Sequence, residues 1–101
     1  MAKLGDRATF AGLAWIREED YPTLLTIFED GDQFAGGWKE WDQRARKVQR
    51  ELEEKGLICE RAYIDPDTFA DWCIRHGVGT GRDGRLKYGA EFIARKAGRH
   101  N

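Results

Sequence analysis

Two segments of the chain have the pattern of strands. Residues 8–16, ATFAGLAWI, contain no charge and are rich in residues that strands accommodate, which predicts a buried strand with Gly12 as a weak point or bulge. Leu57 to Ile64, LICERAYI, predicts a second strand.

Helical spacing of apolar residues predicts two helices between these strands. The segment Arg17 to Asp30 opens with acidic residues, tolerates Pro22 in its first turn, and carries one apolar stripe, formed by Tyr21, Leu24, Leu25 and Phe28. The strongest helical pattern follows a glycine-rich loop over residues 31–37 and ends before Gly56. Its apolar stripe consists of Trp38, Trp41, Ala45, Val48 and Leu52. This narrow stripe covers either the protein's own sheet or a dimer seam.

Two more helices are predicted after the second strand. Asp65 is expected to be the N-cap of the third helix and Pro66 its first residue, with Gly77 at its end. One face of this helix carries Phe69, Trp72, Cys73 and His76. Residues 77–84, GVGTGRDG, predict a loop, and a last helix from about Arg85 to Ala97 is expected to turn four residues inward: Leu86, Ala90, Ile93 and Ala97.

The resulting order, β-α-α-β-α-α, predicts a single α+β domain over residues 1–101. Its small sheet, of two strands or slightly more, would be covered by about four helices. Hydrophobic residues make up 41% of the chain and aromatic residues 12%, which supplies the apolar material of a packed core. Because a two-stranded sheet is marginal alone, a further strand would come from elsewhere in the chain or from a partner.

The two cysteines, Cys59 and Cys73, are too few for a disulfide-stapled secreted domain. The N-terminus lacks a charged segment followed by an apolar one, and no apolar run approaches membrane length. We therefore expect a cytoplasmic protein of bacterial type that does not enter a membrane.

Charge is sorted along the chain. Residues 1–74 hold 10 Lys and Arg against 16 Asp and Glu, whereas residues 75–101 hold 7 against 2. A basic C-terminal segment of this kind either binds an external polyanion or pairs with the protein's own acidic body, above all with residues 18–32.

Catalytic and metal-binding patterns are weak. Asp65, Asp67 and Asp71 could hold Mg²⁺, but helix capping and the helix dipole already explain them. Cys73 and His76 could form a thiolate–imidazole pair, although the apolar face they share favours an unreactive buried thiol. The glycine loop lacks the ending of a P-loop. The sequence thus predicts no cofactor, no metal and no catalytic residue, and it favours a non-enzymatic protein.

Three strings, WIREEDYPTLLTIFED, GGWKEW and YIDPDTFADWC, resemble segments of a group of small bacterial proteins. The resemblance covers about residues 15–76, and YIDPDTFADWC is its most specific part. Because that group has no assigned activity, cofactor or site, the resemblance implies a bacterial cytosolic origin and no functional residue.

Two functions follow as hypotheses. The first is binding of a protein partner, or of a second copy, through aromatic anchors at Phe34, Trp38, Trp41, Tyr88 and Phe92. The alternative is a small nucleic-acid-binding regulator that uses basic residues of segment 75–101, namely Arg82, Arg85, Lys87, Arg95, Lys96 and Arg99.

Overall fold

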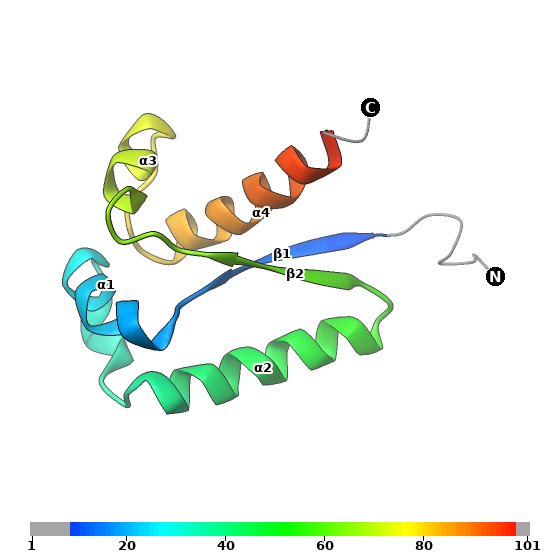
Figure 1. The fold of residues 1–101 in the computed structure, drawn as a ribbon, viewed down its shortest axis with the longest axis horizontal. Coiled ribbons are helices and arrows are strands. Elements are labelled where there is room, and N and C mark those ends of the chain that lie inside the picture. Colours follow the sequence, from blue (N-terminus) through cyan, green and yellow to red (C-terminus); the bar gives the residue numbers. More distant parts are fainter. Residues whose placement is uncertain (1–8, 99–101) are drawn as a thin grey trace.

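The computed structural model describes residues 9–98 and has the predicted α+β architecture (Figure 1). Two strands and four α-helices follow in the order β-α-α-β-α-α: β1 (Phe10–Trp15), α1 (Tyr21–Ile27), α2 (Trp38–Glu54), β2 (Ile58–Tyr63), α3 (Phe69–Arg75) and α4 (Arg82–Gly98). Two short 3-10 helices, Glu18–Asp20 and Gly31–Phe34, flank α1. Both strands and the long second helix therefore form where the apolar patterns predict them.

The two strands are parallel, with Phe10 opposite Ile58 and Trp15 opposite Tyr63. Parallel pairing requires a crossover, and α1 and α2 supply it. In Figure 1, α2 lies on one side of the strands and α4 on the other, so the sheet is the middle of three layers. Side chains alternate between these layers, and Trp15 contacts Trp41 of α2 with ring centroids 5.3 Å apart.

The other face of β1 meets α4 backbone to backbone. A Cβ placed on Gly89 would overlap the carbonyl oxygen of Gly12 and lie 2.9 Å from its carbonyl carbon. A Cβ on Gly12 would in turn overlap the carbonyl of Gly89 and lie 2.6 Å from Cγ1 of Ile93. Only glycine at both positions permits this approach.

The main core lies at the carboxyl ends of the strands, where α1, α3 and the start of α4 converge (Figure 1). Phe69 is at its centre, with ring centroids 5.8 Å from Phe28 and 5.5 Å from Tyr88. The predicted apolar face of α3 is confirmed as part of this core, since Phe69, Trp72 and Cys73 are buried. Five of the nine buried residues of this core are aromatic, so aromatic side chains supply much of its apolar contact.

Several predicted helix boundaries are wrong. The helix expected over residues 17–30 is a 3-10 turn followed by α1, which ends at Ile27. The third helix begins at Phe69, not at Pro66, because Asp65 caps a preceding turn: its Oδ1 accepts a hydrogen bond from the Asp67 backbone N–H at 2.9 Å. Helix α4 begins at Arg82, three residues before the predicted start.

The predicted inward face of the last helix is also wrong. Leu86 is 58% exposed and Ala90 is exposed, whereas Gly89 is buried against the sheet. Ile93 is half-buried beside Gly12, and the side chain of Ala97 lies outside the described residues. The physical reason is the contact between Gly12 and Gly89, which places the side of α4 that carries glycine against β1.

Within residues 9–98, none of the helices combines the length and apolar character needed to cross a bilayer.

The glycine contact predicts the effect of Gly89→Ala. Alanine normally stabilises a helix relative to glycine by up to about 1 kcal/mol. Here the added methyl group has to displace backbone of β1, so we expect a net loss of about 1–3 kcal/mol in urea unfolding.

Ala90→Val, at the exposed neighbouring position of α4, is the matched control and should change stability by less than about 1 kcal/mol. A Gly89→Ala variant as stable as the wild type would contradict the close approach.

Candidate functional site

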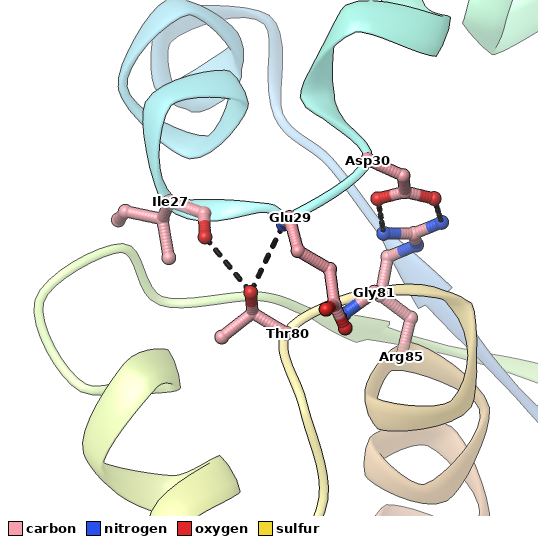
Figure 2. A network of polar contacts seen from close by, with 6 residues as sticks. All are labelled: Ile27, Glu29, Asp30, Thr80, Gly81 and Arg85. Carbon is pink, nitrogen blue, oxygen red and sulfur yellow. Dashed lines mark hydrogen bonds and ion pairs between the residues drawn. The ribbon is translucent and has the colours of Figure 1, made fainter.

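A set of polar contacts joins the start of α4 to the loop after α1 (Figure 2). Thr80 Oγ1 donates a hydrogen bond to the carbonyl of Ile27 at 2.9 Å and accepts one from the backbone N–H of Glu29 at 3.0 Å. The Glu29 carboxylate accepts a hydrogen bond from the Gly81 N–H at 3.0 Å. The glycine-rich loop thus satisfies backbone groups of this protein.

Arg85 completes the junction. Its two terminal nitrogens each donate a hydrogen bond of 2.8 Å to one oxygen of Asp30, as Figure 2 shows. The guanidinium also lies over the rings of Phe28 and Phe34, 4.7 Å and 5.0 Å from their centroids. The hydrogen bonds from Arg85 hold the pKa of Asp30 below its ordinary value. Bidentate geometry and partial burial make this pair stronger than a surface ion pair.

An apolar groove of about 330 Å³ opens beside this junction. Its floor is the edge of β1 from Gly12 to Ile16, and α2 and α4 form its two walls. The α2 wall consists of Trp41, Ala45 and Val48, and the α4 wall of Arg82, Arg85 and Leu86; Phe34 also lines the groove. A groove of this volume falls in the range of ligand pockets, roughly 300–1,000 Å³.

The floor of the groove carries unpaired backbone groups. Hydrogen bonds from the Ile58 N–H to the Thr9 carbonyl and from the Ile64 N–H to the Trp15 carbonyl fix which residues of β1 face β2. In a parallel ladder these are the alternate residues, so Gly12 and Ala14 direct their N–H and C=O groups away from β2. Within the described part of the chain, no hydrogen bond to these two residues is found on that side.

The two rows of α2 that face the sheet differ in polarity. Over β2 the row is polar, because Gln49 accepts a hydrogen bond from Arg61 and Asp42 is buried beside Arg46. Towards the open edge of β1 the row is apolar, and Val48 in it is 49% exposed. The predicted stripe of α2 therefore points partly beyond the sheet, over an empty strand position.

The five predicted aromatic anchors do not form one surface. Phe34 is buried in the core, where its carbonyl accepts a hydrogen bond from Tyr21, and it reaches the groove only at its end. Trp38 is half-buried and donates a 2.8 Å hydrogen bond to the Ile16 carbonyl, whereas Trp41 is half-buried and lines the groove. Tyr88 packs on Trp72 and Phe69. Phe92 is half-buried under Lys96, whose Nζ lies 5.7 Å from its ring centroid.

Two cations of the nucleic-acid hypothesis are hydrogen-bonded to acids. Arg85 pairs with Asp30, within the predicted acidic segment 18–32, whereas Lys96 pairs with Glu60 of β2 at 2.9 Å. Lys87 lies 4.0 Å from Glu91 of its own helix. Arg82 and Arg95 are exposed and have no carboxylate within 4.0 Å among residues 9–98, and Arg99 lies outside the described residues.

The residues weighed for catalysis or metal binding have structural surroundings. Cys73 is 1% exposed, and burial raises the pKa of its thiol. His76 stacks on Trp72, and its Nδ1 lies 2.8 Å from the Trp72 carbonyl oxygen. Across residues 9–98, no three His, Cys, Asp or Glu side chains are grouped to hold a metal ion.

Sequence reasoning missed the edge of β1 and Leu86 as parts of a surface. The one signal for the edge was the uncharged segment ATFAGLAWI, whose apolar character did not reveal that one side of the strand has no partner strand among residues 9–98.

Comparison of the chain with protein-family models, curated proteins and solved structures finds no match.

The Asp30–Arg85 pair predicts a specific pH dependence of stability. The pKa of Asp30 is lowered from 3.8 in the folded state, so the unfolded chain takes up the proton first on acidification. The stabilisation is complete above about pH 5 and is lost as the pH falls through the lowered pKa. Asp30→Asn should cost about 1–3 kcal/mol at pH 6, and the two proteins should converge at low pH.

Urea unfolding from pH 6 to pH 2.5 measures this effect, and Asp32→Asn, at an exposed position in the same loop, is the control. A constant difference between wild type and Asp30→Asn at every pH would contradict the ion pair.

Thiol reactivity provides a further prediction. Burial raises the pKa of both Cys59 and Cys73, and a protonated thiol is a poor nucleophile. Iodoacetamide at pH 7 should therefore alkylate the folded protein slowly, with Cys73 the slower of the two because Cys59 is only half-buried. Mass spectrometry with and without urea measures both rates; rapid native labelling of Cys73 would instead favour a catalytic thiol.

Proposed function

We propose that this protein binds another protein by accepting an extended segment of it alongside β1. One observation carries the proposal: the edge of β1 that no other strand of residues 9–98 pairs with forms the floor of an apolar groove between α2 and α4. Binding of this kind adds a strand to the sheet, with main-chain hydrogen bonds for affinity and side-chain pockets for specificity.

The chemistry of the edge supports this function. An open edge is a template for pairing with another chain, and natural proteins usually protect it with charges, proline or a covering segment. The stretch from Thr9 to Ile16 contains neither a charge nor a proline. Gly12 and Ala14 present the donors and acceptors that an added strand needs.

The two walls supply the apolar contacts. Val48 of α2 and Leu86 of α4 are 49% and 58% exposed, and both line the groove. Full burial of an aliphatic side chain of this size contributes about 1.5–3 kcal/mol, and because each of these two is already about half-buried, covering the rest contributes roughly half of that. Trp41, in the same wall as Val48, is the kind of residue that dominates binding hot spots.

The nucleic-acid alternative gains no comparable support. Two of its cations, Arg85 and Lys96, are hydrogen-bonded to acids of the same chain, which reduces the charge offered to phosphate. That alternative stays a prediction.

A random nonapeptide library displayed on phage tests the proposal. Selected peptides should perturb the amide NMR signals of Gly12 and Ala14 most and slow their hydrogen exchange, because these groups would gain partners. The double variant Val48→Gln/Leu86→Gln should weaken their binding at least about tenfold, because it replaces one apolar side chain in each wall of the groove.

The control is Ile74→Gln, at a 75% exposed apolar position on α3, away from the groove, and its affinity should equal that of the wild type. If no peptides are enriched, or if the enriched ones bind regardless of Val48 and Leu86, the proposal is wrong.

A further inference from the structure

We propose that the segment bound beside β1 has a defined chemistry. It alternates small residues, which face α4, with large apolar residues, which face α2, and it places an acidic side chain next to Arg44 and Arg82. This inference rests on the proposed function and specifies the class of partner.

The requirement for small residues comes from the position of α4. A Cβ on Gly89 would overlap the Gly12 carbonyl oxygen and lie 3.2 Å from the backbone nitrogen of Ala14. Both of these atoms point away from β2, so α4 passes over the open edge itself. A strand added there runs beneath the same helix. A residue as small as glycine or alanine fits at the point where the backbone of α4 comes closest to the sheet.

The opposite side of the added strand has more room. The α2 wall consists of Trp41, Ala45 and Val48, and the groove in front of it is apolar. Because successive side chains of a strand alternate, residues that flank a small one point to this wall. Valine, leucine or isoleucine at these positions would bury the exposed part of Val48.

The acidic requirement comes from the charges at the carboxyl end of β1. A neighbouring hollow, which shares Phe34, Trp41 and Val48 with the groove, is lined by Arg44, Arg82 and Arg85, against one acid, Asp30. Asp30 is already bonded to Arg85. Arg82 is exposed without a carboxylate within 4.0 Å in the described chain, and Arg44 lies only 4.0 Å from Glu40, so a carboxylate of the partner meets two available guanidiniums.

A second copy of this chain that pairs through its own β1 does not fit these requirements. Two β1 strands paired about a two-fold axis would be about 4.8 Å apart, whereas packed helices need 8–10 Å between axes. Because α4 lies over the edge, the two α4 helices would collide. The segment from Thr9 to Ile16 also contains no acid to pair with Arg44 and Arg82.

NMR titration of the full-length ¹⁵N-labelled protein with three acetylated, amidated heptapeptides tests this rule. The reference peptide is Glu-Val-Ala-Leu-Ala-Val-Glu, in which a glutamate reaches the arginines whichever way the strand runs. One comparison peptide has lysine at both ends, and the other has leucine in place of both alanines. The reference peptide should bind at least about tenfold more tightly than either, through Gly12 and Ala14.

The charge preference should disappear or reverse in Arg44→Glu/Arg82→Glu. The matched control, Arg75→Glu/Arg95→Glu, makes the same charge change at exposed helix positions outside the groove and should keep the preference. Equal affinities for the three peptides, or failure of all three to bind, would overturn the rule. The proposed function fails separately, only if the random library yields no ligand that depends on Val48 and Leu86.

Discussion

The backbone contact between Gly12 of β1 and Gly89 of α4 is the constraint on which the rest of the structure depends. Since no side chain separates the two segments, α4 packs close to the sheet and crosses the open edge of β1. From this position Arg85, one turn earlier on α4, reaches Asp30, and Leu86 forms a wall of the groove. A side chain at either glycine would lift α4 and alter both features together.

The uneven distribution of charge along the sequence has a structural explanation in the packing of α4. Part of the basic segment neutralises the acidic body, because Arg85 bonds to Asp30 and Lys96 to Glu60. The two original hypotheses, an intramolecular partner or an external one, are therefore not exclusive. Arg82 stays exposed beside the groove, one turn from Arg85. The nearby acid, Asp30, is already paired with Arg85.

The secondary structure was largely predictable because it is encoded locally. The spacing of Trp38, Trp41 and Val48 defines α2 without reference to any other element, and the uncharged run around Leu13 defines β1. The packing of α4 was not predictable in this way. Apolar periodicity assigned Leu86 to the core, whereas the buried side of the helix is marked by Gly89, which contributes no hydrophobicity to such a pattern.

The groove was not predicted because it depends on which edge of a strand is paired. Strand order in the sheet cannot be predicted from the residues of either strand alone. Once the order is known, composition becomes informative. Interior strands of parallel sheets are apolar throughout, and charged residues belong on edges. β2 carries Glu60 and Arg61 and has the composition of an edge strand, whereas β1 has no charge and the composition of an interior strand, although both are edges of this sheet. The apolar row of α2 points to the same side as this mismatch. Two independent features, the strand's own residues and the helix packed on it, thus have the character of a sheet interior on a side of β1 where residues 9–98 place no further strand, and they support the proposal that a strand of another protein binds there.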